Sequence, residues 1–503
     1  MTLPGWLDPL WVADEMRAAD AWAVERDGVA SLDLMERAGE GLARVVAEAA
    51  GDGPVRVVVG GGNNGGDGLV AARLLRADGW MVDVLSVASL DRLSGDARAN
   101  LERLQGDAPE PFAGERLARS GVVLDAMLGT GFAGSAREPV AGAIAAVRAQ
   151  IAPVVACDVP SGVDASSGEV AGVAVRATVT ATFHGPKLGL HVAPGAHHAG
   201  VVEAIEIGIA RGAPGPRTAG LISPRALALV PRRPRGGSKF TSGTVVVAGG
   251  AQGLTGAPRM AALAAMRAGA GYVQLAVPRS TEMVFSLALM EAMTRGLEED
   301  GGTHCAAGVA AVEELAERAG CVVLGPGLSR SDSAVAFARS VALAVDAPLL
   351  IDADGLNAHA GTLESLRVRR GPTVLTPHAG ELGRLLGRES AEIDAHRLAC
   401  AREAAQRSGA VVVLKGDDSI VADPGGLVAV SPGASAALAT AGTGDVLSGV
   451  IGALLAKGLG PFEAAAAGVL AHARAGQAAA ERRGADHTIA GDVIDALAEA
   501  MRA

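Results

Sequence analysis

Aromatic residues are scarce in this chain, with four tryptophans, one tyrosine and seven phenylalanines among 503 residues. The hydrophobic core must therefore be built from Ala, Val and Leu. Proteins that bind single-stranded nucleic acid usually stack bases on aromatic rings, so this composition argues against that function. The formal net charge of −11 argues against it too, because the chain as a whole lacks a basic surface for nucleic acid. An acidic balance of this size mainly promotes solubility.

Cysteine is also rare, and Cys157, Cys305, Cys321 and Cys400 form no CxxC pair or other zinc-binding spacing. Cys157 and Cys321 lie in apolar runs and are expected to be small core residues. The N-terminus has no basic segment before an apolar stretch, so no signal peptide is expected. No apolar run is long enough for a membrane span. We expect a cytoplasmic protein that binds neither nucleic acid nor membranes.

Hydrophobic residues make up 49 % of the chain and charged residues 20 %, which is typical of a globular protein with more than one domain. Short apolar strands alternate with helical segments, starting with a helical stretch at 14–48 and a strand at 55–59. This alternation indicates βαβ units around a mostly parallel sheet covered on both faces. A stretch rich in Pro, Gly and Arg at 208–243 interrupts the pattern, and we place the boundary between two α/β domains there.

The clearest motif is GGGNNGGDG at 60–68, between a predicted strand and a predicted helix. Glycines let the main chain approach a ligand and expose its N–H groups, and a helix N-terminus favours an anion. The motif is neither a GxGxxG fingerprint nor a Walker A loop. A plain turn from strand to helix needs only one or two glycines, so the motif favours a ligand-binding loop.

Two further predicted strands end in acidic motifs: Asp125 begins DAMLGTGFAG and Asp158 begins DVPSGVD. Ligands bind beyond the carboxyl ends of the strands in an open parallel sheet, so the three loops should meet at one site. Either aspartate alone could be a capping residue. Together they could perform acid–base chemistry or bind a hard cation through oxygen.

These motifs, with ADEMRAAD and DLMERAG before them, resemble the NAD(P)H-hydrate epimerase domain over about residues 10–215. The resemblance implies a Rossmann-like doubly wound fold, interconversion of the R and S hydrates of NADH and NADPH, and a bound potassium ion. It gives potassium to Asp125, Ser161 and one of two neighbouring asparagines, assigned to Asn64. Lys187, in HGPKLG, matches a family position whose role is left open. It implies that Asp158 is catalytic and that substrate contacts Asn63, Asn64, Gly65, Gly66, Asp67, Gly129, Thr130, Gly131, Phe132, Ala133, Gly134, Ser135 and Asp158.

The second half contains AGTGD at 441–445 at the start of a predicted helix. The amides of Gly442, Thr443 and Gly444 could form an anion hole for a transferring phosphate, and Asp445 could deprotonate a hydroxyl. An aspartate at a helix start is often only a cap. The chemical role gains support from further polar strand ends, LGPGLS, TPHAGE and LKGDDS, the last of which could hold a nucleotide phosphate.

The blocks IDADGLNAHA, TPHAGEL, LKGDDS and ATAGTGDVLSG resemble ADP-dependent NAD(P)H-hydrate dehydratases of the ribokinase-like superfamily over about 222–500. The resemblance implies removal of water from the S hydrate at the expense of ADP, which becomes AMP and phosphate, with Asp445 catalytic. We expect Mg²⁺ on the phosphates. Ser329 occupies a position where the family usually has Gly. ADP would contact Lys415, Gly416, Asp417, Asp418, Ser419 and Gly444, and the hydrate would contact Ala257, Gly327, His378 and Asp445.

The expected organisation is an epimerase domain at 1–215, a linker and start of the second domain at 216–243, and a dehydratase domain at 222–503. We expect a bifunctional metabolite-repair enzyme that forms a homo-oligomer. Two alternatives stay open. The second half could be a ribokinase-like kinase for a small alcohol, and the first half could bind a nucleotide without catalysis. The sequence decides neither ADP against ATP nor NADH against NADPH.

Overall fold

The computed structural model describes residues 3–210 and 212–502, which form two compact units. The first unit comprises Pro9–Ala219. The second joins the N-terminal residues up to Asp8 to the chain from Gly220 onward. The expected first domain began at residue 1, so the structure differs at this end: the first described residues pack with the second unit.

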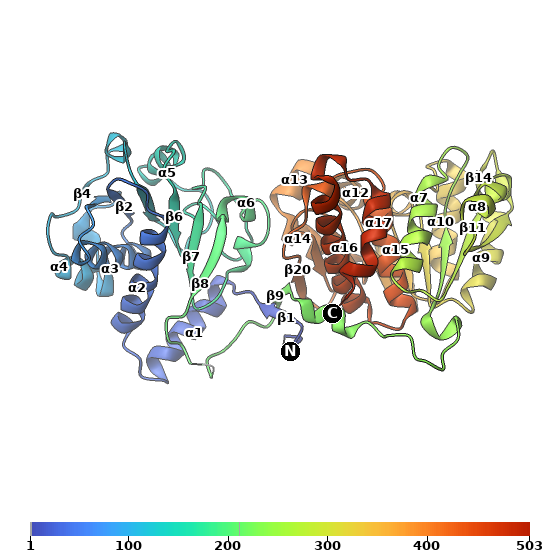
Figure 1. Cartoon of the computed structure of the whole chain (residues 1–503), viewed down its shortest axis with the longest axis horizontal. Coiled ribbons are helices and arrows are strands. Elements are labelled where there is room, and N and C mark those ends of the chain that lie inside the picture. The colour runs from blue at the N-terminus through green and yellow to red at the C-terminus, as the bar shows by residue number, and fades with distance from the viewer. Residues whose placement is uncertain (1–2, 211, 503) are drawn as a thin grey trace. The chain divides into compact units, whose positions relative to one another are not determined.

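The first unit is built on a seven-stranded parallel sheet with the order β4-β3-β2-β5-β6-β7-β8 (Figure 1). Its strands are β2 (Val55–Val59), β3 (Val82–Ser86), β4 (Glu110–Pro111), β5 (Val122–Ala126), β6 (Val154–Cys157), β7 (Val179–Phe183) and β8 (Val201–Ile205). Its helices are α1 (Ala13–Glu25), α2 (Ser31–Ala49), α3 (Asn63–Ala77), α4 (Gly95–Arg103), α5 (Val140–Arg148) and α6 (Ala196–Ala199).

The side chains of β2 show that both faces of this sheet are covered. Val57 and Val59 belong to a buried cluster with residues of α2 and α3, such as Leu42. Val58 belongs to a different cluster with Ile144 of α5. Because side chains alternate along a strand, these clusters lie on opposite faces, which confirms the predicted doubly wound arrangement.

The predicted helical stretch at 14–48 is two helices in the structure. Helix α1 ends at Glu25 and α2 begins at Ser31. Gly28 between them has a φ of +73°, a backbone conformation that glycine adopts without a steric penalty. The apolar pattern alone did not show this break, because both helices bury residues against the same unit.

The second unit contains an eleven-stranded sheet with the order β1-β9-β20-β19-β18-β17-β16-β15-β10-β11-β12. The run from β18 to β12 is parallel, whereas β18, β19 and β20 pair antiparallel. The strands are β1 (Leu7–Pro9), β9 (Ala219–Ile222), β10 (Thr244–Ala248), β11 (Tyr272–Pro278), β12 (Met293–Leu297), β15 (Cys321–Leu324), β16 (Leu349–Ile351), β17 (Thr373–Leu375), β18 (Val411–Leu414), β19 (Ile420–Ala422) and β20 (Val428–Val430). A separate hairpin comprises β13 (Glu299–Asp300) and β14 (Thr303–His304).

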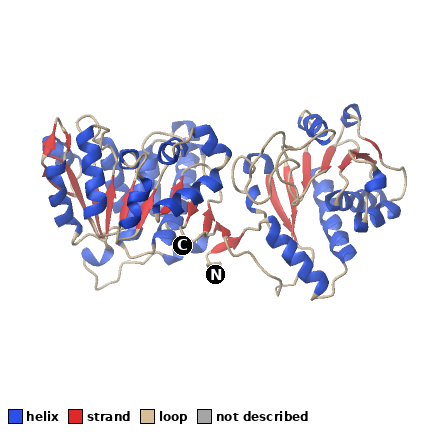
Figure 2. Cartoon of the chain, turned by 180° about the vertical axis from the view of Figure 1, so that it is seen from behind, coloured by secondary structure: helices blue, strands red, loops and turns tan. Residues whose placement is uncertain are grey.

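Helices pack on both faces of this sheet as well, as the view coloured by secondary structure shows (Figure 2). They are α7 (Gly256–Arg267), α8 (Glu282–Ala288), α9 (Val309–Ala316), α10 (Asp332–Ala344), α11 (Asp354–Ala358), α12 (Ala379–Leu386), α13 (Ser390–Ala395), α14 (Arg397–Ser408), α15 (Thr443–Ala456), α16 (Pro461–Arg483) and α17 (Ala490–Ala500). The fold class predicted for both halves, a mainly parallel α/β sheet, is confirmed.

The segment expected to hold the linker contains ordered structure. It includes β9 and a 3₁₀ turn at Pro224–Leu229. The backbone N–H and hydroxyl of Ser223 donate hydrogen bonds to the carbonyl of Trp6, at 3.3 and 2.9 Å. The Trp6 ring lies 5.6 Å from that of Phe462 on α16. The N-terminal segment is therefore anchored in the second unit by an aromatic contact and paired backbone.

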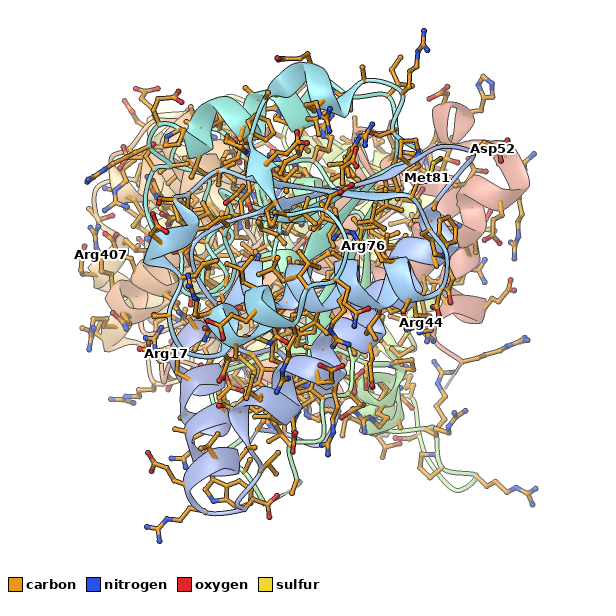
Figure 3. All side chains as sticks on the ribbon, turned by 90° about the vertical axis from the view of Figure 1, so that its left-hand side faces the viewer. Arg17, Arg44, Asp52, Arg76, Met81 and Arg407 are labelled. Atoms are coloured by element: carbon orange, nitrogen blue, oxygen red, sulfur yellow. The ribbon has the colours of Figure 1, made fainter. Side chains whose placement is uncertain are left out.

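Charged side chains such as Arg17, Arg44 and Asp52 lie on the outside of the first unit (Figure 3). Cys157 and Cys321 are completely buried, which confirms their predicted place in the cores. Within 3–210 and 212–502, no helix is long and apolar enough to cross a membrane.

Candidate active sites of the two units

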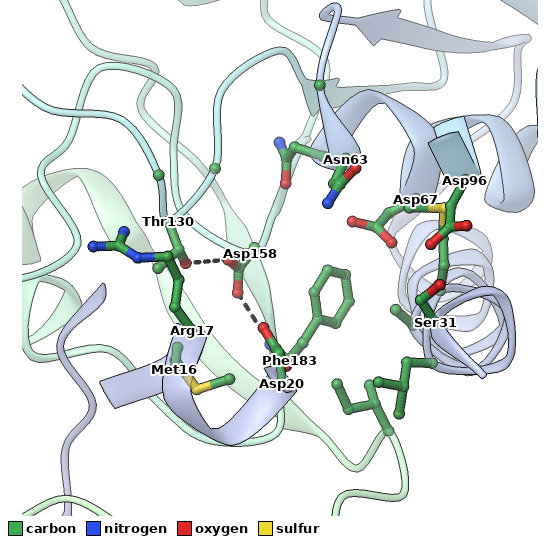
Figure 4. A pocket seen from close by; sticks show the side chains of 18 of the residues that line it. Met16, Arg17, Asp20, Ser31, Asn63, Asp67, Asp96, Thr130, Asp158 and Phe183 are labelled. Atoms are coloured by element: carbon green, nitrogen blue, oxygen red, sulfur yellow. Dashed lines mark hydrogen bonds between the residues drawn. The ribbon is translucent and has the colours of Figure 1, made fainter. Parts of the chain in front are cut away.

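The first unit contains a cavity of about 970 Å³ at the carboxyl ends of its central strands (Figure 4). The loops after β2, β5 and β6 form one part of its wall, and α1 and α2 form another. The structure thus brings the three predicted loops to one site. Of the predicted substrate contacts, the cavity is lined by Asn63, Asn64, Asp67, Gly129, Thr130, Gly131, Phe132, Ala133 and Asp158. Gly65, Gly66, Gly134 and Ser135 are not among its lining residues.

The glycines of the first loop allow α3 to begin directly against the sheet. A Cβ on Gly65 would lie 2.2 Å from the carbonyl oxygen of Gly60, and one on Gly66 would lie 2.8 Å from the sulfur of Met35. Such contacts are far inside van der Waals distance. Gly65 and Gly66 therefore serve packing, whereas Asn63 and Asn64 face the cavity.

Asp158 and Lys187 form a buried ion pair at the base of the cavity. Lys187 Nζ lies 2.6 Å from Asp158 Oδ1 and donates to the carbonyl of Phe183 at 2.7 Å. Thr130 and Thr182 donate hydroxyl hydrogen bonds to the same carboxylate. Burial raises the pKa of Asp158, but the Lys187 ammonium and these hydrogen bonds outweigh it, so the pKa is lowered. Asp158 also has a φ of +65°, a strained conformation typical of functional positions.

Two more carboxyl groups reach the cavity without such a partner. Asp67 comes from α3 and Asp20 from α1. Burial is the largest cause of a raised pKa at both, and Asp158 raises each further. Neither Asp20 nor Lys187 was assigned a role from sequence. Asp20 is the last residue of the ADEMRAAD block that contributes to the family resemblance, but nothing in that block distinguishes it from Asp14, Glu15 and Arg17.

The potential cation ligands lie together beside the cavity. Ser161 donates from its hydroxyl to Asp125 Oδ1 at 2.6 Å and from its backbone N–H to Oδ2 at 2.8 Å. The Ser161 hydroxyl also accepts the Leu128 N–H at 2.9 Å. The next residue, Gly129, lies against the Asn64 amide, whose oxygen would be 2.7 Å from a Cβ there. Asn64, Asp125 and Ser161 thus form one polar cluster.

This cluster can accommodate a monovalent cation. The Asn64 side-chain nitrogen is buried, and no described residue offers it a hydrogen-bond partner. A flip of the amide would place its oxygen there instead. Burial raises the pKa of Asp125 to about 6 despite the hydrogen bonds that it accepts from Ser161 and Met127. In the described ranges, no three His, Cys, Asp or Glu side chains form a metal-binding group, so amide and hydroxyl oxygens would have to contribute.

In the second unit, polar side chains meet at the carboxyl ends of β16, β17 and β18. Lys415 Nζ lies 3.0 Å from Asp352 Oδ1 and 3.6 Å from Glu381 Oε2. The Ser448 hydroxyl, on α15, donates to Asp352 Oδ2 at 2.7 Å. Burial lowers the pKa of Lys415, but the two carboxylates raise it more, so the ammonium stays charged. Lys415 therefore lies between two carboxylates, at 3.0 and 3.6 Å.

The AGTGD loop faces this cluster. A Cβ on Gly444 would lie 3.4 Å from Lys415 Nζ, so the glycine permits the close approach of the ammonium. Asp445, in the first turn of α15, has a pKa raised to about 7, first by burial and then by Asp352. A carboxyl group with this pKa is suited to general acid–base work near neutral pH.

Other predicted contacts of this site have structural partners. The His378 ring caps α12: its Nδ1 accepts N–H groups of Gly380 and Glu381, at 3.0 and 3.4 Å. Asp418 is buried and paired with Arg397, Nη2 to Oδ1 at 2.6 Å. Arg397 Nη2 also donates to the Lys415 carbonyl at 3.3 Å, so Arg397 fixes the loop that contains Gly416, Asp417 and Ser419. Asp417 is exposed and Asp418 is not.

Ala257 lies in the first turn of α7, and Gly327 follows β15, the strand that neighbours β16. Gly327 has a φ of +62°, and a Cβ there would lie 2.4 Å from the carbonyl oxygen of Leu254, just before α7. Ser329 has a φ of +79°, so a serine adopts the conformation that glycine favours, and its N–H donates to Asp354 at 3.1 Å. No role was predicted for Asp352 or Arg397 from the amino-acid sequence. Asp352 directly follows a strand, which was an available signal, whereas Arg397 lies on a helix and gave none.

Two family models match the chain. Residues 31–189 match the family described as YjeF-related protein N-terminus, and residues 245–499 match NAD(P)H-hydrate dehydratase. A protein of Salinibacter ruber, named bifunctional NAD(P)H-hydrate repair enzyme Nnr, is 42 % identical over 447 residues, or 83 % of this chain and 82 % of that protein. The chain belongs to the family of bifunctional NAD(P)H-hydrate repair enzymes.

Members of the NAD(P)H-hydrate repair family from other organisms match over the same extent. The protein of the same name from Moorella thermoacetica is 38 % identical over 84 % of this chain and 83 % of its own length. That from Escherichia coli K12 is 36 % identical over 82 % and 78 %. Membership of the NAD(P)H-hydrate repair family confirms the bifunctional activity predicted from the two resemblances.

Among solved structures, an ADP/ATP-dependent NAD(P)H-hydrate dehydratase from Bacillus subtilis, co-crystallised with ATP/Mg²⁺, is similar to part of the chain. It is 28 % identical, with a TM-score of 0.47, and the match covers 55 % of this chain and 94 % of that one.

Proposed function

We propose that the cavity of the first unit interconverts the R and S hydrates of NADH and NADPH, and that the site beside α15 removes water from the S hydrate at the expense of ADP. The observation that carries this proposal is the presence of two separately built acid–base sites. One centres on Asp158, the other on Asp445. Each lies at the carboxyl ends of parallel strands, where α/β proteins bind their ligands.

The dehydration site combines a base with an anion-binding loop. Water is a poor leaving group, so the hydroxyl is first phosphorylated by ADP, which yields AMP. The phosphate then leaves and the neighbouring ring carbon loses a proton, which restores the C=C bond of NAD(P)H. Asp445 accepts the hydroxyl proton, and the amides of the AGTGD loop stabilise the phosphoryl group in transit. Lys415, held by Asp352 and Glu381, keeps a positive charge 3.4 Å from the Cβ position of Gly444 and supports the anion there. A Mg²⁺ ion would neutralise part of the negative charge of the ADP phosphates.

The remaining residues of this site bind rather than react. The exposed Gly416 and Asp417 and the half-buried Ser419 lie on a loop anchored by Arg397, and we assign them to ADP together with Lys415, Asp418 and Gly444. His378, Ala257 and Gly327 are assigned to the hydrated nicotinamide nucleotide. Because Asp418 is buried in its pair with Arg397, its contribution is to shape the loop.

In the first unit, Asn64, Asp125 and Ser161 would hold potassium. The ion would supply a fixed positive charge beside the loop that carries Gly129 and Thr130. Asp158, kept ionised by Lys187, faces the cavity and serves as the base that acts on the hydrate. Asn63, Asp67 and the 129–133 segment supply the surrounding contacts.

The decisive test incubates the purified chain with a mixture of R and S hydrates, ADP and Mg²⁺, and follows recovery of the nicotinamide absorbance and of AMP. We expect both epimers to be consumed and one AMP to form per NAD(P)H restored. Consumption of only the S epimer would contradict the epimerase assignment. A phosphorylated product that accumulates without NAD(P)H recovery would instead favour a ribokinase-like kinase of a small alcohol.

A further inference from the structure

Two carboxyl groups in the same cavity have opposite surroundings. Asp158 is bound by the Lys187 ammonium and accepts hydrogen bonds from Thr130 and Thr182. Asp67 is only 9 % exposed, and among the described residues only burial and the charges of Asp158, Asp20 and Lys187 act on it, with no hydrogen bond among the causes of its pKa shift. In Figure 4, Asp158 and Thr130 lie on one side of the pocket and Asp67 lies on the other.

A buried carboxyl group without a partner favours its protonated form, since a carboxylate there would lose its hydration without compensation. The groups that face Asp67 add to this preference. Asp158 at the end of β6 and Asp20 on α1 are both acidic, and Cys157 on β6 provides no positive charge. Lys187 lowers the pKa of Asp67, but this ammonium is engaged by Asp158. Arg17 on α1 and Asp96 on α4 also line the cavity, and Figure 4 shows Asp96 beside Asp67. The pKa of Asp67 is raised well above its ordinary value, first by burial and then by these carboxylates.

We propose that Asp67 is the catalytic proton donor of the epimerisation and that the Asp158 carboxylate is its partner base. This inference rests on the epimerase activity proposed above and gives that reaction its acid. Two carboxyl groups whose environments separate their protonation states are suited to these two roles.

The chemistry of the hydrate requires both roles. A dihydronicotinamide is an enamine, so water adds its hydroxyl to the carbon bonded to the ring nitrogen. Asp67 transfers its proton to that hydroxyl, the C–O bond breaks with its electrons leaving on water, and the nitrogen lone pair forms a C=N⁺ bond. Water then adds to the other face of the carbon. Asp158 takes the released proton, and the nitrogen regains its lone pair.

These reaction steps conserve all atoms and invert the configuration of the carbon that bears the hydroxyl. The proton on Asp158 returns to Asp67 through solvent before the next turnover in the same direction, and the two groups exchange roles in the reverse direction. The hydroxyl oxygen of the product therefore comes from solvent. Enzyme-dependent incorporation of ¹⁸O from labelled water is a direct signature of this route.

The test compares Asp67→Asn with Asp78→Asn in the full-length protein. Asp78 is an exposed residue at the end of the same helix, so it provides the same chemical change outside the cavity. Removal of a general acid costs about 10²- to 10⁴-fold in rate. We expect D67N to lose at least about 100-fold in kcat for epimerisation and in ¹⁸O incorporation, while the Kd for the equilibrated hydrates changes by less than about threefold. D78N should match the wild type.

The pH profile separates this role from simple substrate contact. In the wild type, the rate should fall as pH rises through the pKa of Asp67, because the donor must be protonated. D67N should lose this alkaline limb, and Asp67→Glu should retain a limb at a shifted pH. An unchanged limb in D67N, or its loss in Asp20→Asn but not in D67N, would overturn the proposal. Absence of epimerisation by the wild type would instead refute the proposed function itself.

Discussion

The ammonium of Lys187 lies 2.6 Å from the carboxylate of Asp158, and the lysine is 1 % exposed. Two charges in such a place are costly to desolvate and stabilise each other only while both are present. Lys187 also donates to the Phe183 carbonyl at the end of β7, so it links the acidic loop after β6 to the neighbouring strand. The pair therefore affects both the stability of the first unit and the ionisation of its base.

Replacing Lys187 by Met should leave the Asp158 carboxylate buried without a counter-charge. Breaking one partner of a buried pair usually costs about 3–5 kcal/mol, and we expect a loss of this size in the free energy of unfolding of the first unit. Urea titration followed by circular dichroism measures it. The double variant Lys187→Met/Asp158→Asn should be more stable than the sum of the two single losses predicts. Simple additivity would show that the two groups do not interact as the structure indicates.

The same pair predicts a dependence of stability on acid. Because the folded state holds the pKa of Asp158 below its unfolded value, the stabilisation is present above the unfolded pKa and is lost as pH falls through the folded pKa. The K187M variant lacks this contribution. Its stability should therefore fall less on acidification below about pH 4 than that of the wild type. Thermal melting across this range compares the two slopes.

Asp352 adjusts the acidity of Asp445 across the second site. Burial raises the pKa of Asp445 to about 7, and the negative charge of Asp352 contributes to that increase, whereas Lys415 opposes it. As a base, Asp445 must be ionised, so dehydration should become faster as pH rises through about 7. Asp352→Asn removes a negative charge and leaves Lys415 in place. In D352N, this rise in the rate of dehydration should therefore occur at lower pH, by up to about one pH unit.

The control for this shift is Asp346→Asn, an identical change at an exposed residue before β16. Initial rates of NAD(P)H recovery from pure S hydrate at saturating ADP, measured between about pH 5 and 9, give both profiles. If the rate of the D352N variant rose over the same pH range as that of the wild type, this would contradict an effect of Asp352 on the pKa of Asp445. A shift in D346N of equal size would show that the effect is not specific to the site.

Asp445→Asn tests the base itself. The variant should lose about 10²- to 10⁴-fold in the rate of dehydration, because it keeps the shape of the side chain but cannot take a proton. Binding of ADP, measured by calorimetry, should change little, since the loop of Lys415 and Arg397 remains intact. Epimerisation of R hydrate should be unaffected in the same preparation. Turnover close to that of the wild type would refute the role given to Asp445.

Much of this arrangement could be predicted because local patterns carry it. The strand at 55–59 followed by GGGNNGGDG, and the aspartates after the next strands, follow from apolar runs that stop at polar residues, and parallel sheets bring such strand ends together. Residues that depend on distant contacts escaped prediction. Asp20 reaches the cavity from a separate helix, and Arg397 acts by pairing with Asp418, twenty-one positions away along the chain.

Other differences have equally physical origins. The antiparallel strands β19 and β20 are only three residues long each, too short for a periodic signal. The N-terminal residues pack with the second unit through Trp6 and Ser223, a contact that no local pattern announces. Lys415 was predicted for a phosphate, and sequence alone could not show that Asp352 and Glu381 surround it, because they come from two other strand ends.

Potassium binding can be tested without any assay of activity. The pKa of Asp125 is raised to about 6 from an unfolded value of 3.8, so the folded state keeps a proton that the unfolded chain has lost. Without a cation, stability therefore declines as pH rises through that window and stays reduced above it. A bound K⁺ favours the carboxylate and offsets this loss. The melting temperature of the first unit should rise in KCl relative to choline chloride, and more at about pH 7.5 than at about pH 5.

Asp125→Asn should abolish this potassium-dependent increase, because it removes the one full negative charge of the cluster formed with Asn64 and Ser161. Asp52→Asn, at an exposed loop position visible in Figure 3, is the matched control and should keep the increase. Differential scanning calorimetry at equal ionic strength separates a specific ion from general screening, since screening would act equally on both variants. An increase of the same size in D125N would place the ion elsewhere, and no increase in the wild type would remove potassium from the site.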